Sequence, residues 1–278
     1  MTNEITHGLW IDDSPALVRT RGYWQRVRDL GFTEAAIMLE TVADTFDPKY
    51  DVLWLAAIAE FAASCGIKLI ITVWPEPRAS YLAVLESRID AYLSAADAIA
   101  LESDGESNWT KRRVVGYPNL DKAGDALVAF YDRVREKQRK RNPNFRIEFT
   151  TFPEHTENSE RADVAPGVDL LFPQAYPVRN RSNGPVPWDA LYGPARMVDH
   201  TLARARLVRG VKEGRVALGC ALAAYDQKWP DHTIAEAMTL AREDALKHGV
   251  KNMRWWSSKW IVGKMANPEV AAWFRSLR

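Results

Sequence analysis

The chain has 278 residues, enough for one large domain with a sizeable core. Its 37 Lys and Arg residues nearly balance 36 Asp and Glu residues, and the formal net charge of +1 gives no electrostatic reason to expect nucleic acid or an anionic membrane as the main partner. Two cysteines, Cys65 and Cys220, exclude a disulfide framework and show no metal-ligand spacing, so we expect both to be small core residues.

Eight short, β-rich apolar runs recur along the chain and predict eight strands. They begin at His7, Thr33, Ile67, Asp97, Phe145, Val168, Arg215 and Asn252. Their apolar residues are nearly continuous rather than alternating, which is typical of parallel strands covered on both faces.

Longer segments with apolar residues at helical spacing lie between most of the runs. We predict helices over 52–66, 80–96, 123–142, 201–214 and 233–249. Eight strands alternating with helices predict an α/β fold, a (β/α)8 TIM barrel that forms one domain over residues 1–278. A doubly wound open sheet is the alternative, and it is disfavoured because no Gly-rich phosphate loop follows the first strand.

The residues at the carboxyl ends of the predicted strands are the first candidates for chemistry, because catalytic groups of such barrels lie there. They include Trp10, Asp12, Asp13, Glu40, Trp74, Glu76, Glu102, Asp104, Glu106, Trp109, Glu154, His155, Gln174, Tyr176, Tyr225, Gln227, Trp255 and Trp256. A carbohydrate site needs this mixture of carboxylates for acid/base work, amides for hydroxyl groups and aromatic rings for sugar faces.

The most informative segment is ALESDGESNW, at the end of the fourth strand. Strand alternation places Glu102, Asp104 and Glu106 on one face if the strand extends that far. Three neighbouring carboxylates repel one another and raise at least one pKa, which allows a glutamic acid to act as a general acid near neutral pH. A solvated acidic loop is the alternative, and the position at the end of the fourth strand disfavours it.

The pattern E-x-D-x-E-x-x-W formed by Glu102, Asp104, Glu106 and Trp109 resembles the strand-four motif of lysozyme-like barrel glycoside hydrolases. These include family 25 muramidases and related phage endolysins, which carry a D-x-E pair there. The pattern also resembles the D-x-x-D-x-D-x-E of family 18 chitinases, with Glu102 in place of an aspartate and Ile99 in place of the first one.

Two further segments carry the resemblance along the chain. FPQAYP, at 172–177, is similar to the strand-six Q-x-Y element of these barrels, and RWWSSKW, at 254–260, is similar to their tryptophan-bearing strand eight. The first strand, LWIDDS, departs from the aspartate-valine-serine start of family 25.

The resemblance implies a muramidase of the endolysin type, which hydrolyses β-1,4 links next to N-acetylated sugars in peptidoglycan. Glu106 would be the general acid, and Asp104 would orient the substrate acetamido group or stabilise charge at the sugar carbon. Tyr176 would hydrogen-bond that acetamide. Asp12 and Glu102 would position water or support Glu106.

Further substrate contacts are expected from Gln174 and from tryptophans at the strand ends. Trp255 and Trp256 must point to opposite faces of the last strand, and Trp256 is favoured for the site. Trp74 and Trp109 complete the predicted binding residues.

Tryptophan is overrepresented, with 11 residues where roughly 3 or 4 would be expected from general composition. Trp24, Trp54 and Trp273 fall in helical segments, and we expect them in the core. The others lie at strand ends or in the loops that follow: Trp10, Trp74, Trp109, Trp188, Trp229, Trp255, Trp256 and Trp260. This distribution indicates a sugar-stacking groove around an acidic centre.

Two alternatives stay open: a family 18-like chitinase or N-acetylglucosaminidase, and a non-catalytic glycan-binding barrel. We expect no cofactor, and no metal because no His/Asp cluster has metal spacing. The basic run 135–141 is interpreted as the solvated end of a helix. The expected partner is a cell-wall glycan, bound by a monomer, with no nucleic acid and no membrane insertion.

The N-terminal sequence MTNEITHGLWIDDS lacks the basic stretch and apolar run of a signal peptide. No apolar stretch approaches the roughly 18–20 residues of a membrane span. We therefore expect a soluble cytoplasmic protein that reaches the cell wall after lysis or by a non-Sec route.

Overall fold

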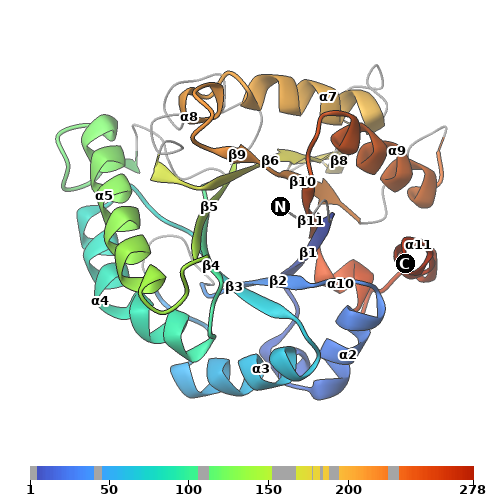
Figure 1. Ribbon diagram of the computed structural model, residues 1–278, viewed down its shortest axis with the longest axis horizontal. Helices are drawn as coiled ribbons and strands as arrows, with labels where there is room; N and C mark the ends of the chain where they lie inside the picture. Colours follow the sequence, from blue (N-terminus) through green and yellow to red (C-terminus); the bar gives the residue numbers. More distant parts are fainter. Residues whose placement is uncertain are drawn as a thin grey trace.

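A ring of parallel strands occupies the centre of the molecule and helices surround it, as Figure 1 shows in a view down the ring. The computed structural model describes residues 5–40, 46–105, 113–151, 167–176, 178–181, 184–187, 194–224 and 232–278. Its strands are β1 (Thr6–Ile11), β2 (Glu34–Met38), β3 (Lys68–Val73), β4 (Ala100–Asp104), β5 (Arg146–Thr151), β6 (Leu170–Ala175), β9 (Ala217–Leu218), β10 (Cys220–Ala223) and β11 (Asn252–Trp256). A separate antiparallel pair, β7 (Val178–Arg181) and β8 (Gly184–Pro187), follows β6.

The ring closes through β10, which pairs with both β11 and β6. Ala221 lies opposite Gln174, and Leu222 lies opposite Ala175. Short β9 and β10 together occupy the seventh position, so the described strands form the eight-position parallel barrel that the sequence predicts. This closure excludes the open-sheet alternative.

Gly219 separates β9 from β10 and interrupts the seventh strand, which the sequence predicts as continuous. A Cβ atom at this position would lie 2.4 Å from the ring of Phe172, so only glycine allows the chain to pass the ring. The Gly219 amide donates to the Leu171 carbonyl at 2.8 Å and keeps the chain on β6.

The outer layer is made of helices (Figure 1). They are α1 (Pro15–Val18), α2 (Arg21–Asp29), α3 (Val52–Ser64), α4 (Ala79–Ala95), α5 (Leu120–Arg139), α7 (Pro194–Ala205), α8 (Arg209–Lys212), α9 (Ile234–Lys247), α10 (Ser258–Ile261) and α11 (Pro268–Ser276). The predicted helix over 201–214 is wrong as a single element. Its chain divides because buried Val208 has extended backbone, with φ −60° and ψ 129°, between α7 and α8.

Apolar packing forms two layers on either side of the strands. The inner layer fills the ring with Trp10, Ala36, Ile70, Ala100, Leu170, Phe172 and Ala221. The outer layer lies between strands and helices and contains both cysteines, which are free and buried as predicted. No helix among the described residues is long and apolar enough to cross a membrane.

Trp54 does not lie in the core, which corrects the prediction for this residue. The helix α3 is apolar almost all round, and its fully buried positions are Leu55, Ile58 and Ala62. Trp54 lies off that stripe, is 36% exposed, and has the Arg19 guanidinium carbon 4.4 Å from its ring centroid. Trp24 and Trp273 are buried as predicted.

A capping box begins α9. The Glu236 amide donates to the Thr233 hydroxyl at 3.2 Å, and the Thr233 amide donates to the Glu236 carboxylate at 2.8 Å. Thr233→Ala is expected to lower the free energy of unfolding by about 1 kcal/mol, because it leaves a helix amide without its acceptor. Urea unfolding followed by circular dichroism measures the effect.

Thr20→Ala is the matched control, because Thr20 precedes α2 but its side chain makes no cap hydrogen bond. A loss as large in Thr20→Ala as in Thr233→Ala would contradict the capping argument.

Candidate active site

The inward face of β4 carries the acidic residues of the fourth strand. Ala100 belongs to the inner layer and Leu101 to the outer layer, so alternation directs Glu102 and Asp104 into the ring. Asp104 is half-buried at the carboxyl end of β4 and lies opposite Thr150 of β5. Glu106 and Trp109 lie outside the described residues, so their predicted roles stay predictions.

Glu102 is fully buried below Asp104 and is surrounded by donors. The Trp10 indole N–H donates to Glu102 Oε2 at 2.9 Å, and the Thr72 hydroxyl donates to the same oxygen at 2.8 Å. The Thr150 hydroxyl donates to Oε1, and Arg254 lies 3.1 Å from Oε2. These contacts favour the role of a support for the residues above it, because solvent does not reach this carboxylate.

A layer of paired charges lies inside the ring at the level of Glu102. The buried Arg254 guanidinium lies 2.7 Å from Glu148 and 4.0 Å from Glu34. Arg146 donates to both carboxylates, at 2.8 Å to Glu148 and 3.1 Å to Glu34. The Arg254 guanidinium carbon also lies 4.2 Å from the Phe172 ring centroid.

Burial alone would lower the pKa of Arg254, but the carboxylates of Glu148, Glu102 and Glu34 outweigh it and leave that pKa raised. Arg254 therefore stays charged and compensates these buried acids. Sequence reasoning missed this residue. The available signal was an arginine at an inward position of an otherwise apolar strand, because such a position requires buried acidic partners.

Asp12 joins the end of β1 to the start of α10. Its carboxylate accepts from the hydroxyls of Ser257 and Ser258, at 2.9 and 3.0 Å, and lies 3.1 Å from the Lys259 ammonium. The Asp12 side chain is mostly buried, and the Trp256–Ser257 peptide bond beside it is cis. Asp12 thus holds the chain directly after β11 in place. This structural role does not depend on a contact with substrate.

Glu40 and Glu76 form a second acidic pair, after β2 and β3. The Tyr81 hydroxyl donates to Glu40 at 2.7 Å, and the backbone amide of Trp74 donates to its other oxygen. Arg113 compensates Glu76 at 2.8 Å. Burial, with a smaller contribution from the Glu76 carboxylate, raises the pKa of Glu40 to about 7 against the lowering effect of its two hydrogen bonds.

Stability should therefore fall as the pH rises from the unfolded pKa of Glu40, about 4.5, to its folded pKa, about 7, because the folded state binds this proton more tightly. The Glu40→Gln variant has no titrating group at this position, so it should not lose stability in this way, and its side-chain oxygen still accepts from the Trp74 amide. We expect the stability of wild type relative to Glu40→Gln to decline by up to about 3 kcal/mol across this range. Urea unfolding at pH 4.5, 6 and 7.5 measures the difference.

Glu60→Gln is the control for this titration, because Glu60 is exposed on α3. Its stability relative to wild type should not change with pH. An equal pH dependence of Glu40→Gln and wild type would contradict the assignment.

The two tryptophans at the end of β11 point to opposite faces. Trp255 packs in the outer layer, with Trp273 5.1 Å away between ring centroids. Trp256 packs against the inner layer, and its ring centroid lies 6.1 Å from that of Trp10 in an edge-to-face arrangement. Trp256 is half-buried, so part of its side chain reaches solvent.

The remaining predicted binding residues also surround this end. Gln174 is buried at the end of β6, and half-buried Tyr176 follows it and packs against the inner layer. Trp74 is half-buried after β3, and its indole N–H finds no hydrogen-bond acceptor in the described part of the chain. The structure thus places these side chains at the same end of the barrel as Asp104, and their contacts with substrate stay predictions.

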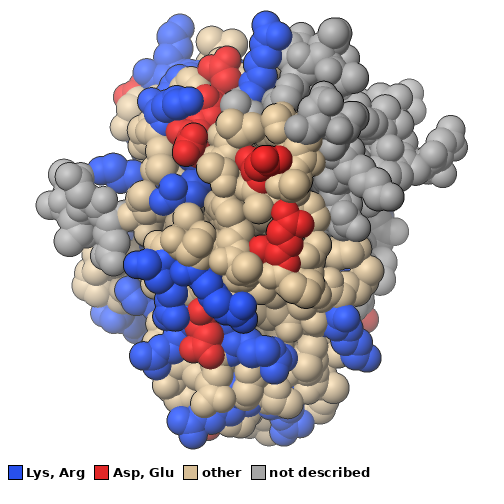
Figure 2. Space-filling model, turned by 90° about the vertical axis from the view of Figure 1, so that its right-hand side faces the viewer, with Lys and Arg blue, Asp and Glu red and all other residues tan. Residues whose placement is uncertain are grey.

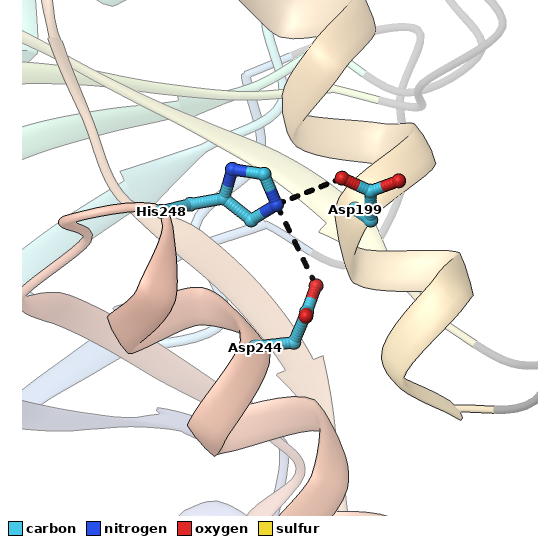
Figure 3. A group of neighbouring side chains, drawn as sticks. All are labelled: Asp199, Asp244 and His248. Carbon is cyan, nitrogen blue, oxygen red and sulfur yellow. Dashed lines mark ion pairs between the residues drawn. The ribbon is translucent and has the colours of Figure 1, made fainter.

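One His/Asp group lies elsewhere, between α7 and α9 (Figure 3). His248 Nε2 lies 2.9 Å from Asp199 and 3.6 Å from Asp244. The Arg206 guanidinium, which can only donate, lies 2.9 Å from His248 Nδ1. Nδ1 therefore accepts and Nε2 keeps its proton for Asp199. A divalent ion at Nε2 would have to displace that proton. Neutral imidazole would then carry its proton on Nδ1, and Arg206 would have to turn away. This arrangement therefore favours hydrogen bonding over metal binding.

The fold resembles that of known glycoside hydrolases. No family model and no curated protein matches the chain. The solved structures that it resembles include the Bacillus cereus spore cortex-lytic enzyme SleL, with TM-score 0.61, 11% identity, and 99% of this chain and 74% of that chain covered. A GH113 β-1,4-mannanase has TM-score 0.62, 14% identity and coverage of 98% and 99%.

The catalytic domain of a chitinase from Pyrococcus furiosus gives TM-score 0.61 at 13% identity, with coverage of 99% of this chain and 95% of that chain. These similarities establish the TIM-barrel fold over nearly the whole chain. At these identities they show the fold alone.

Proposed function

We propose that the chain is a glycoside hydrolase that cleaves β-1,4 links next to N-acetylated sugars in peptidoglycan. The observation that carries this proposal is the inward acidic row of β4, in which Asp104 lies above the buried Glu102 at the carboxyl end of the barrel. Continued alternation would direct Glu106 into the same space. Known barrels of this shape that act on glycan polymers support the assignment.

The two outer carboxyl groups would divide the chemistry. Glu106 would give its proton to the leaving oxygen, and water would supply the hydroxyl group of the new reducing end. Asp104 would orient the acetamido group or stabilise positive charge at the sugar carbon. Glu102 would support them from below, because Arg254 and three neutral donors hold its carboxylate in place.

The aromatic side chains at this end would bind the sugar rings. Trp256 is half-buried next to Trp10, and Tyr176 follows the end of β6. Apolar sugar faces stack on such rings, while carboxylates and amides take the hydroxyl groups. This combination favours a polymer of pyranose sugars over a phosphorylated metabolite.

Peptidoglycan is proposed over chitin because of the strand-four resemblance to muramidases and the cortex-lytic enzyme among the structural neighbours. Purified protein would be incubated with peptidoglycan sacculi, chitin oligomers and β-1,4-mannan, and soluble fragments would be analysed by mass. We expect fragments from sacculi that end in reducing N-acetylmuramic acid. An Asp104→Asn/Glu106→Gln double variant controls for contaminating hydrolases.

Each other outcome selects a different function. Fragments from chitin alone would replace the muramidase by a chitinase, an alternative that the P. furiosus enzyme supports. Binding to a glycan without fragments from any of the three polymers would indicate a non-catalytic barrel and contradict the proposal.

A further inference from the structure

Six arginines gather on one outer face of the barrel, which we call the arginine face: Arg19, Arg21, Arg26, Arg28, Arg275 and Arg278. All are exposed. They come from the α1–α2 segment and from the end of α11, and Arg278 joins the two by donating to the carbonyls of Asp29 and Arg28 at 3.1 and 3.2 Å. Figure 2 shows this side of the molecule, where Lys and Arg gather over the lower half and outnumber the acidic side chains that lie among them.

These arginines lack the acidic partners that several exposed arginines have elsewhere. Arg133 pairs with Glu86, and Arg209 and Arg215 both pair with Glu213. The predicted basic run 135–141 is likewise a solvated helix end with ion pairs to acids. None of the six arginines of the arginine face forms an ion pair with any residue that the structure describes.

Helix stability does not account for all of this charge. Arg26 and Arg28 lie in the last turn of α2, where cations interact favourably with the helix dipole. Arg21 is the first residue of α2, where a cation is unfavourable, and no acidic residue lies in that first turn. Arg21 therefore does not contribute to the stability of its own helix through the dipole.

Two exposed apolar side chains adjoin the arginines. Arg19 stacks on the exposed ring of Trp54, and the neighbouring Leu53 is 81% exposed. Guanidinium groups bind phosphate through paired, charge-assisted hydrogen bonds, and adjoining rings add area for sugars or chain carbons. The face therefore fits a polymer that carries phosphate groups on a carbon backbone.

The arginine face begins next to the candidate active site. β1 ends at Ile11 beside Asp12, α1 follows directly, and α2 then returns along the outside of the barrel. The nine residues of α2 span about 13 Å. A wall polymer bound along α2 would thus hold the protein in the wall. The carboxyl end of the barrel, with the candidate active site, would then lie beside the glycan strands of that wall.

We propose that the arginine face binds the phosphodiester groups of an anionic cell-wall polymer. This partner rests on the proposed peptidoglycan substrate, because it must lie in the same wall. The net charge of +1 does not oppose it, since binding depends on the local field of unpaired cations rather than on the total.

The test measures cosedimentation with wall sacculi that retain a phosphodiester polymer and with sacculi from which hydrogen fluoride has removed it. A Glu106→Gln background prevents digestion. Arg21→Gln/Arg28→Gln is compared with the matched control Arg209→Gln/Arg215→Gln, which removes the same charge from a paired site. Salt is varied from 50 to 300 mM NaCl, and duplex DNA is the second polyanion.

We expect the Arg21→Gln/Arg28→Gln protein to bind intact walls at least tenfold more weakly than the protein with both arginines at 50 mM salt. The slope of its log affinity against log salt concentration should be smaller in magnitude by about 1.5 to 2. The control variant Arg209→Gln/Arg215→Gln should bind intact walls as tightly as the protein with both arginines. Binding to stripped walls should not depend on Arg21 and Arg28. Equal binding by both double variants, undiminished binding to stripped walls, or tighter binding to DNA than to walls would overturn the proposal.

Hydrolysis of short soluble glycan fragments separates this proposal from the proposed function. Without the Glu106 substitution, Arg21→Gln/Arg28→Gln should cleave these fragments at the wild-type rate and lose activity only on intact walls. A wild-type protein that binds walls through the arginines but releases no fragments would leave the docking surface standing and remove the hydrolase.

Discussion

Replacement of Glu106 by glutamine is expected to lower kcat on the natural glycan by about 10²–10⁴-fold, the usual contribution of a general acid. Glutamine has the same shape but no proton to give to the leaving oxygen. The loss should therefore depend on the leaving group. On a 2,4-dinitrophenyl glycoside, whose leaving group departs without a proton, we expect the first step to lose less than tenfold.

Asp104→Asn is the matched variant, because its proposed role is at the sugar carbon rather than at the leaving oxygen. It should lose activity on both substrates. The high-pH limb of kcat/KM should also disappear in Glu106→Gln and remain in Asp104→Asn. Equal losses on both substrates in Glu106→Gln, or a loss under tenfold on the natural glycan, would contradict its role as the acid.

Arg254→Met is expected to lower the free energy of unfolding by about 3–5 kcal/mol at pH 7.5, the usual cost of breaking a buried ion pair. Methionine fills similar space, but among the described residues it leaves Glu34 and Glu148 with only Arg146 as a cationic partner and Glu102 with none. Urea unfolding measures the loss.

Neutralising the acids should restore part of this stability. We expect the triple variant Arg254→Met/Glu102→Gln/Glu148→Gln to be more stable than Arg254→Met alone, because the uncompensated charge is gone. A cost below 1 kcal/mol for Arg254→Met, or a triple variant that is less stable than the single, would show that the interior charges do not depend on Arg254.

The barrel could be predicted because its strands are nearly continuous apolar runs bounded by polar residues. The errors occur where local pattern does not determine burial. Helix α3 is apolar on nearly every face, so periodicity could not exclude Trp54 from the core. The break at Gly219 depends on the ring of Phe172, which belongs to another strand.

The candidate site was predictable to the level of a strand end. Alternation alone places Glu102 and Asp104 on one face. It could not predict that Trp10, Thr72 and Arg254 surround Glu102, because those contacts depend on the register of strands far apart in the sequence. The high pKa of Glu40 likewise arises from its burial beside Tyr81 and Trp74, which only the packed structure reveals.

Arg254 belongs to the last strand, so a ribosome makes it after all three of its carboxylate partners. A nascent chain that ends before β11 contains Glu34 and Glu148 with their partner Arg146, but it contains Glu102 without the cation that compensates it inside the ring. A ring that still lacks β11 should therefore keep Glu102 in water rather than collapse on it. Synthesis of β11 would then couple barrel closure to the arrival of Arg254.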